Sequence, residues 1–226
     1  MAIIEYVIDK SGIKRDTITI NKSGFSISAA FIKSQKLLQK QAIKFYMDDE
    51  DIYWLGFEFF DETGNQNTLS LLNKGSSGGR QSAARIVKAA QLFSKSELLK
   101  AIKNDPDREV RTFEVKKEKR NGKYYINLKP CFENRIAWEE RNKIDSRTQG
   151  IYRYLDKDGN TIYIGKGIIK ERAISPERKS WGVKLIEFSE VSNEEDSVRW
   201  EHFYISQYEK RNGRKPIFNL VSGVSG

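Results

Sequence analysis

Two tyrosine-containing triplets, separated by ten residues, are the part of this chain best suited to do chemistry. Gly150-Ile151-Tyr152 and Tyr163-Ile164-Gly165 flank the dipeptide Asp158-Gly159, which favours a two-residue type I′ turn. With that turn, Tyr154 faces Tyr163 and Tyr152 faces Gly165. Side chains alternate along a strand, so the three phenols share one face, and Gly165 leaves space over Tyr152. Taken alone, the pattern also fits an ordinary aromatic hairpin, since Tyr is common in strands.

A carboxylate further along the chain lies in an unusual place. Glu201 falls in a predicted helix, where its neighbours at three- and four-residue spacing are Val198, Tyr204 and Ile205. An ionised carboxylate in such a stripe costs several kcal/mol if it is dry and unpaired. A divalent cation removes that cost, and Mg²⁺ commonly takes only one or two protein carboxylates. The alternative is a rotated helix that turns Glu201 to solvent.

The order of these features resembles the GIY-YIG nuclease family over about residues 149–221. After the two triplets come Lys166 and Arg172, then Trp200-Glu201-His202-Phe203, and finally Pro216-Ile217-Phe218-Asn219. The combination is specific, although either triplet alone is weak. The resemblance implies an antiparallel sheet flanked by helices and the metal-assisted hydrolysis of phosphodiester bonds, leaving a 5′-phosphate.

The resemblance also implies a role for each residue of the site. Tyr152 is expected to be the general base, with Lys166 and the metal supplying the positive charge that lowers its pKa from about 10. Tyr163 orients the water or hydrogen-bonds the phosphate, and Arg172 binds the scissile phosphate with its planar fork. The remaining expectations are Glu201 as ligand of Mg²⁺ (or Mn²⁺), Asn219 as a brace, Lys170 as a DNA contact, and Gly150 and Gly165 as structural glycines.

Each of these residues has a plainer interpretation. The tyrosines fit core packing, which is the reason Tyr154 is left out of the site, and Arg172 fits a solvated helix face. The sequence also departs from the family in two places. Arg172 lies one residue nearer the second triplet than is usual, and Pro176 stands where many members have a histidine. The only histidine, His202, projects about 100° around the helix from Glu201 and fits packing better than catalysis.

Composition limits the other classes of function. The chain has 226 residues, of which 38% are apolar and 31% charged, and no apolar run approaches a membrane span. The N-terminus lacks the pattern of a signal peptide. Cys131 is the single cysteine, which excludes an internal disulfide and fits the reducing cytoplasm. The sequence therefore predicts a cytoplasmic protein without a membrane partner.

The net charge of +9 indicates a polyanionic partner, and most of the excess lies in residues 1–150. A predicted hairpin (Val110–Val115 and Tyr124–Leu128) flanks the turn Asn121-Gly122 and is rich in lysine. We expect its Lys119, Arg120 and Lys123, with Arg80 of a Gly-rich loop, to contact DNA. A solvated hairpin tip is the alternative. Tyr53, Trp54 and Phe57 are expected in the core rather than in a base-stacking platform.

The elements expected from pattern give an α+β chain of two domains. A β-rich α+β domain (1–145) has strands at 16–28, 42–47, 51–60 and 67–72 and helices at 30–39, 83–93 and 94–103, the last with Ser94 and Glu97 as capping box. Residues 131–148 are a connector, with the boundary within 140–149. The nuclease domain (146–226) has strands at 150–155, 161–165 and 182–191, helices at 168–175 and 193–210, and an extended tail at 216–221.

The function expected is that of a metal-dependent DNA endonuclease of restriction or mobile-element type, in which the N-terminal domain contacts DNA. Three alternatives remain: a nucleic-acid-binding protein that keeps the nuclease fold without catalysis, a DNA-repair incision nuclease, and a module that binds an acidic protein. One active site cuts one strand at a time, so double-strand cleavage requires a homodimer or sequential action.

Overall fold

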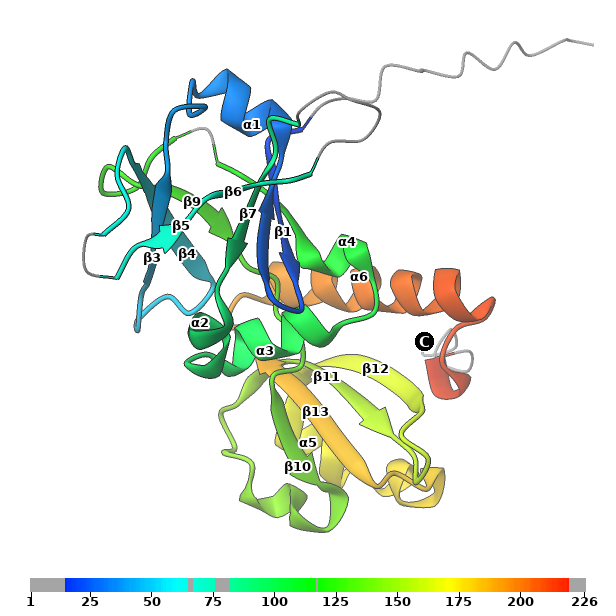
Figure 1. Ribbon diagram of the computed structural model, residues 1–226. Helices are drawn as coiled ribbons and strands as arrows, with labels where there is room; N and C mark the ends of the chain where they lie inside the picture. The colour runs from blue at the N-terminus through cyan, green and yellow to red at the C-terminus, as the bar shows by residue number, and fades with distance from the viewer. Residues whose placement is uncertain (1–14, 65–66, 76–81, 117, 220–226) are drawn as a thin grey trace, which may run out of the picture. The chain divides into compact units, whose positions relative to one another are not determined.

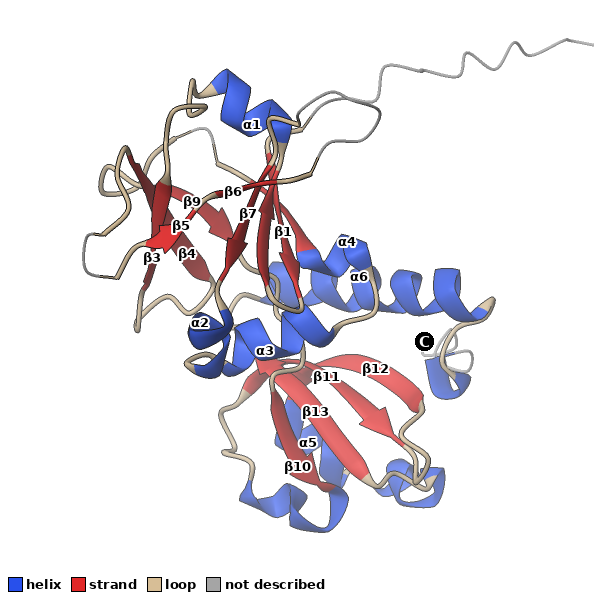
Figure 2. Ribbon diagram, viewed as in Figure 1, coloured by secondary structure: helices blue, strands red, loops and turns tan. Residues whose placement is uncertain are grey.

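The computed structural model describes residues 15–64, 67–75, 82–116 and 118–219. The fold class is α+β, with helices and small antiparallel sheets (Figures 1 and 2). The chain forms two compact units. Unit 1 contains residues 1–89 and 112–127, and unit 2 contains residues 90–111 and 128–226. The division differs from the expected boundary within 140–149, because residues 90–111 and the segment after Asn127 belong to the second unit.

The described residues of unit 1 form two antiparallel sheets and one short helix. The first sheet has the order β6-β7-β2-β1-β8. Its strands are β1 (Thr17–Asn21), β2 (Gly24–Ile27), β6 (Leu72–Asn73), β7 (Arg85–Lys88) and β8 (Thr112–Glu114). The second sheet has the order β5-β3-β4-β9. Its strands are β3 (Ala42–Met47), β4 (Trp54–Phe60), β5 (Leu69–Ser70) and β9 (Tyr124–Asn127), and the helix is α1 (Ala29–Ser34).

An aromatic core joins the two sheets of unit 1. Phe25 of β2 stacks on Phe45 of β3, with ring centroids 4.4 Å apart. Phe57 is fully buried and packs against Phe31 and Phe59. Alternation along β3 and β4 places these side chains on the inner face, so the even-numbered residues of both strands point outward.

Two expectations for unit 1 were wrong. Residues 83–93 do not form one helix, because Arg85–Lys88 pair as β7 between β6 and β2. The β-branched Ile86 and Val87 suit that central strand. The predicted hairpin around Asn121-Gly122 is also divided. The turn is present, with left-handed φ of 53° and 73°, but β8 pairs with β1 and β9 pairs with β4.

Unit 2 has a four-stranded antiparallel sheet of order β10-β13-β11-β12. The strands are β10 (Asn134–Ala137), β11 (Gln149–Leu155), β12 (Thr161–Ile168) and β13 (Leu185–Glu190). The helices are α2 (Ala90–Ser94), α3 (Glu97–Asn104), α4 (Arg108–Arg111), α5 (Ile169–Ile174) and α6 (Glu194–Asn212), with 3₁₀ turns η1 (Trp138–Lys143), η2 (Pro176–Trp181) and η3 (Ile217–Asn219). In Figure 2 the long α6 runs along one side of this sheet.

Most elements of unit 2 agree with the pattern, with three differences. The cap of α3 is Ser96, whose side chain accepts from the Leu99 N–H, and not Ser94. The supposed connector contains β10 and η1, which pattern alone did not distinguish from loop. The end of the described chain is a 3₁₀ turn rather than an extended tail.

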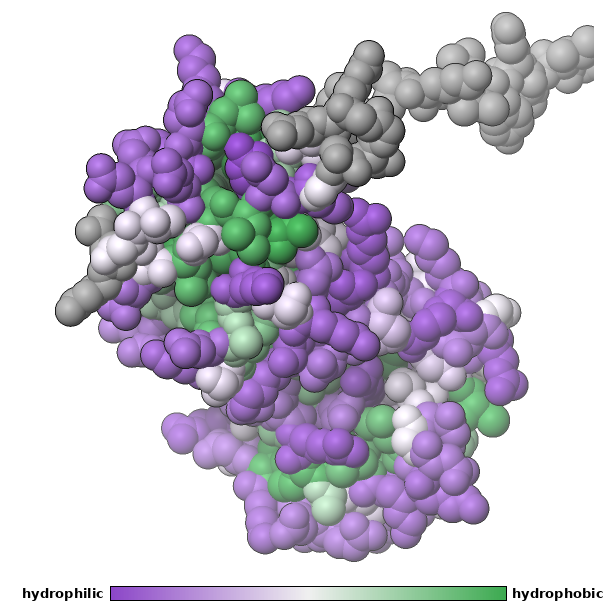
Figure 3. Space-filling view, viewed as in Figure 1, coloured by the Kyte–Doolittle hydropathy of each residue, from purple (hydrophilic) through white to green (hydrophobic). Residues whose placement is uncertain are grey.

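The surface fits a chain in which nearly a third of the residues are charged. Hydrophilic side chains cover most of the face shown in Figure 3, with apolar areas over parts of both units. In the described part of the chain, no helix combines the length and the apolar character needed to cross a membrane.

Candidate active site

The hairpin of β11 and β12 carries both tyrosine triplets in the predicted register. Tyr152 pairs with Gly165, and Tyr154 pairs with Tyr163. The turn that produces this register is not the predicted one. Gly159 has a left-handed φ of 79° and its N–H bonds to the Asp156 carbonyl, so the loop is a type I turn closed by glycine. That loop alone would shift the pairing by one residue, and a bulge at Ile162 restores it.

Both motif glycines are required by close contacts. A Cβ on Gly150 would lie 2.0 Å from the Ser189 carbonyl oxygen of the neighbouring strand. A Cβ on Gly165 would lie 2.7 Å from the Tyr152 hydroxyl and 2.5 Å from Cε1 of Tyr163. The space that Gly165 leaves is therefore occupied by the phenol of Tyr152.

The three phenols form a cluster on one face of the sheet, as predicted. Their ring centroids lie 5.0 to 6.0 Å apart. The cation that joins them is Arg178 of η2. Its Nη1 donates to the hydroxyl of Tyr152 at 3.1 Å and to that of Tyr154 at 3.5 Å. The guanidinium carbon lies 4.8 Å from the ring centroid of Tyr163.

Burial decides the protonation of Tyr152. Its side chain is 1% exposed. Burial raises the pKa of Tyr152 well above 10, Tyr154 and Tyr163 raise it further, and Arg178 only partly opposes them. Burial and the neighbouring phenols therefore oppose the ionisation that the expected role of Tyr152 as general base requires. The expected neighbour was wrong, because Lys166 alternates to the other face of β12 and the cation beside Tyr152 is Arg178. Of the two tyrosines in the triplets, Tyr152 is buried and Tyr163 is half-buried.

A second group of site residues gathers where β12 passes into α5. Lys166 Nζ donates to Glu194 Oε1 at 2.5 Å, and Gln149 donates to the other oxygen of that carboxylate at 3.2 Å. Arg172 is exposed, and its Nε would lie 3.4 Å from a Cβ on Gly167. Glu194 opens α6, where an acidic residue is favoured by the helix dipole.

Glu201 faces this group from α6. Its side chain is half-buried, one turn from the buried Ser197 and Tyr204. Burial raises the pKa of Glu201, Lys166, His202 and Arg172 lower it, and Glu194 raises it. These influences place Glu201 within electrostatic reach of Lys166 and Arg172. The helix is therefore oriented as the apolar stripe predicted, and not with Glu201 turned fully to solvent.

The carboxylate of Glu201 fits a divalent cation. Within the described ranges, no hydrogen bond or ion pair ends on its oxygens, which leaves their lone pairs open. In the same ranges no group of three or more His, Cys, Asp and Glu side chains is arranged to hold a metal. A site here would use Glu201, with Glu194 nearby, and complete its coordination with water, as Mg²⁺ sites commonly do.

Asn219 braces the edge strand through its amide. Its Oδ1 accepts from the Ile164 N–H at 2.9 Å, and its Nδ2 donates to the Ile164 carbonyl at 2.7 Å. The side chain thus satisfies both outward backbone groups of β12 between the second-triplet residues Tyr163 and Gly165. The expected role of Asn219 as a brace fits this geometry, in which its amide contacts the strand backbone.

The site residues are partly brought together. Lys166 and Arg172 lie at and just after the end of β12, within electrostatic reach of Glu201. The phenols lie on the face of the sheet that carries Gly165 and Gly167, and the hydroxyl of Tyr152 and the guanidinium of Arg172 lie beside these two successive glycines. Positions two apart on a strand are about 7 Å apart, so Arg172 adjoins the phenol cluster along this face, whereas Lys166 lies on the opposite face of β12.

The expected DNA contacts outside this site have varied surroundings. Lys170 is half-buried on α5, and Arg80 lies outside the described residues. In unit 1, Arg120 is ion-paired to Asp51 at 2.8 Å and to Asp48 at 3.5 Å. Lys119 lies over the Tyr124 ring at 4.2 Å and Lys123 over the Tyr46 ring at 4.6 Å.

Comparison with known proteins adds no relative to this geometry. No protein-family model matches the chain, and no curated protein or solved structure matches it.

Proposed function

We propose that the chain is a metal-dependent DNA endonuclease of the GIY-YIG type, with the catalytic site in unit 2. The observation that carries this proposal is that Lys166 and Arg172 lie within electrostatic reach of Glu201 at the end of β12, with Arg172 on the face that carries the phenol cluster. Two cations and an open carboxylate at one place suit a phosphodiester and a divalent cation. The resemblance of the two triplets and of Asn219 to the family supports the same class.

Each side chain has a role in the proposed hydrolysis. Arg172 is exposed and binds the scissile phosphate, where its charge opposes the negative charge that develops in the transition state. Lys166 is held by Glu194 and keeps positive charge beside Glu201. Tyr163 is the phenol with access to solvent, and it orients the attacking water, whose proton passes to the surrounding solvent. Tyr152 is too deeply buried for that role and supports Tyr163 within the cluster.

Glu201 would hold Mg²⁺ or Mn²⁺, which would supply Lewis-acid stabilisation of the phosphoryl and leaving oxygens when bound. Asn219 keeps Tyr163 in place by pairing with the backbone of the next residue. A restriction-type or mobile-element enzyme in the cytoplasm is the form of the proposal that the sequence favours, and DNA is its partner.

One observation favours a second candidate, a nucleic-acid-binding protein that keeps this fold without catalysis. Tyr152 is buried and bonded to Arg178, and Pro176 replaces the usual family histidine. A protein that binds DNA without cleaving it does not need Tyr152 to be accessible or to ionise. The two candidates make opposite predictions for cleavage and the same prediction for binding.

The test is the nicking of supercoiled plasmid by the purified chain in Mg²⁺, beside Glu201→Ala and Glu209→Ala. Both residues lie on α6, and Glu209 is exposed, so Glu209→Ala is a matched control. We expect wild type and Glu209→Ala to nick the plasmid, and Glu201→Ala to lose about 100-fold or more of the rate. Equal nicking by all three would remove Glu201 from the mechanism. DNA binding without nicking would favour the second candidate.

A further inference from the structure

The outer face of the second sheet of unit 1 carries aromatic side chains on three adjacent strands. Tyr46 of β3 and Tyr125 of β9 both pair with Gly56 of β4. The indole of Trp54 lies over Gly56, where a Cβ would be 2.1 Å from its Cη2 atom. The ring centroids of Trp54 and Tyr125 are 6.4 Å apart. Glycine at position 56 thus lets the indole lie across the sheet between two tyrosines.

Tyr46 and Tyr125 are not part of the core. The core side of the same strands is filled by Leu55, Phe57 and Ile126, which are fully buried. Tyr46 and Tyr125 alternate to the opposite side and are half-buried. Trp54 was expected in the core, and it is buried, at 7% exposed, on the side of β4 that carries Gly56.

Cations border this aromatic face. Lys44 and Lys123 lie over the Tyr46 ring, at 5.3 and 4.6 Å from its centroid. The guanidinium of Arg120 lies 5.5 Å from the centroid of the Trp54 ring. Aromatic rings beside lysine and arginine side chains suit a chain of bases and phosphates, because bases stack on the rings and the cations neutralise the phosphates.

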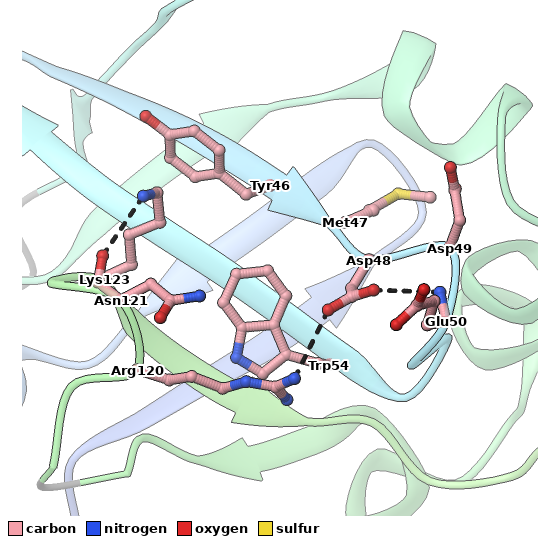
Figure 4. Close-up of a pocket in the computed structure, with 9 residues that line it drawn as sticks. All are labelled: Tyr46, Met47, Asp48, Asp49, Glu50, Trp54, Arg120, Asn121 and Lys123. Atoms are coloured by element: carbon pink, nitrogen blue, oxygen red, sulfur yellow. Dashed lines mark hydrogen bonds and ion pairs between the residues drawn. The ribbon is translucent and has the colours of Figure 1, made fainter.

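A cavity of about 430 Å³ lies at the end of the face where Arg120 reaches the acidic turn, and its volume is within the range of small-ligand pockets. Figure 4 shows Tyr46 and Trp54 on one strand pair, with Asn121, Arg120 and Lys123 opposite them. The Trp54 Nε1–H is buried and has no hydrogen-bond partner in the described structure. The buried donor and the cavity beside it are unusual for a plain surface, since buried donors are nearly always bonded.

We infer that this outer face binds single-stranded DNA by stacking bases on Tyr46, Trp54 and Tyr125. Arg120 covers the indole and is held there by Asp48 and Asp51. A phosphate of the DNA competes with these two carboxylates for the guanidinium of Arg120. When the guanidinium moves to the phosphate, the indole of Trp54 is uncovered and a base can stack on it. The carboxylates and the amide of Asn121 can also bond the exocyclic amino groups of bases. This inference deepens the proposed function, on which it rests for the choice of DNA, by naming the form of DNA that unit 1 takes.

The experiment measures the binding of the full chain to a labelled single strand, the matching duplex and the matching RNA strand by fluorescence anisotropy. EDTA is present throughout, so that cleavage does not contribute. We expect the single strand to bind at least tenfold more tightly than the duplex, and the RNA strand no more tightly than the DNA strand. Binding should weaken steeply as salt rises from about 50 to 200 mM.

Variants separate stacking from general charge. Tyr46→Ala and Tyr125→Ala should each lower the affinity for the single strand about tenfold. Tyr46→Phe keeps the ring and loses only the hydroxyl bond to Glu58, so it should bind like wild type. Asp51→Asn loosens Arg120 and should raise the affinity up to about fivefold at low salt. Trp54 is left intact because its replacement would disturb packing.

Equal affinity for duplex and single strand would overturn the inference, as would unchanged binding by both alanine variants that remain folded by circular dichroism. Tighter binding of RNA would overturn the choice of DNA. Plasmid nicking without single-strand preference would leave the nuclease proposal standing and remove only this inference. Single-strand preference without plasmid nicking would support this inference and remove the nuclease proposal.

Discussion

Replacement of Gly165 by alanine tests the packing of the phenol cluster. The added Cβ would lie 2.5 Å from Cε1 of Tyr163, 2.7 Å from the Tyr152 hydroxyl and 2.8 Å from its Cζ. Inserting a methyl group into so tight a place costs about 1–3 kcal/mol. If Tyr152 swings aside, it also gives up its bond from the Arg178 guanidinium, at 3.1 Å, and a bond of this kind contributes about 1.5–3 kcal/mol. We expect a total loss of about 2.5–6 kcal/mol in the free energy of unfolding when both contributions are lost.

The assay is chemical denaturation followed by near-ultraviolet circular dichroism, which reports the tyrosine environment, and by far-ultraviolet signal. Gly75→Ala is the control, because a Cβ there has nothing within 4 Å. Its φ is not left-handed, so we expect it to be neutral or to stabilise by up to about 1 kcal/mol. Gly165→Ala within about 0.5 kcal/mol of Gly75→Ala, with the tyrosine signal unchanged, would refute the packing described for β11 and β12.

Two further predictions concern buried groups of unit 2. Arg178→Met should lower the free energy of unfolding by about 1–3 kcal/mol, because it leaves two buried phenols without their common donor. Lys179 on the same turn is exposed, so Lys179→Met should change the free energy of unfolding by less than about 0.5 kcal/mol. Equal effects of the two variants in urea denaturation would contradict the hydrogen bonds described for Arg178. Burial raises the pKa of the Cys131 thiol from 9.0 to about 12, so its contribution to stability is complete below pH 9 and is lost as the pH rises toward 12. At pH 10.5 wild type should have lost about 2 kcal/mol relative to Cys131→Ala, compared with the difference at pH 8, and a pH-independent difference would show that the thiol is not buried.

Local patterns predicted much of unit 2. Alternation placed the three phenols on one face, and the apolar stripe of α6 placed Glu201 toward the sheet. The register around Tyr152 was correct although the turn was not, because the bulge at Ile162 compensates for a longer loop. Such compensation is invisible in sequence, since turn chemistry fixes pairing only near the turn.

Contacts between distant segments account for what pattern missed. Arg178 lies in a 3₁₀ turn after Pro176, where no periodicity indicates which side chain points inward. The segment that contains Ile86 and Val87 was predicted to be helical, because the sequence does not show that β6 and β2 pair with it. Trp54 lies two residues before Gly56 and therefore points to the same side of β4, toward Tyr46 and Tyr125. The sequence did not indicate this side, because aromatic residues occupy both faces of the strand. The basic tip around Arg120 was predicted, but its pairing with the acidic turn was not.

The most direct test of the nuclease proposal is the chemistry of the cut ends. Supercoiled plasmid is incubated with the chain in Mg²⁺, and the nicked circles are isolated and treated with a DNA ligase without prior phosphorylation. The proposal predicts nicks that the ligase reseals, because hydrolysis at the leaving 3′ oxygen gives a 3′-hydroxyl and a 5′-phosphate, and it predicts no nicks in EDTA. Absence of nicking in both Mg²⁺ and Mn²⁺, or nicks that form equally well in EDTA, would contradict it.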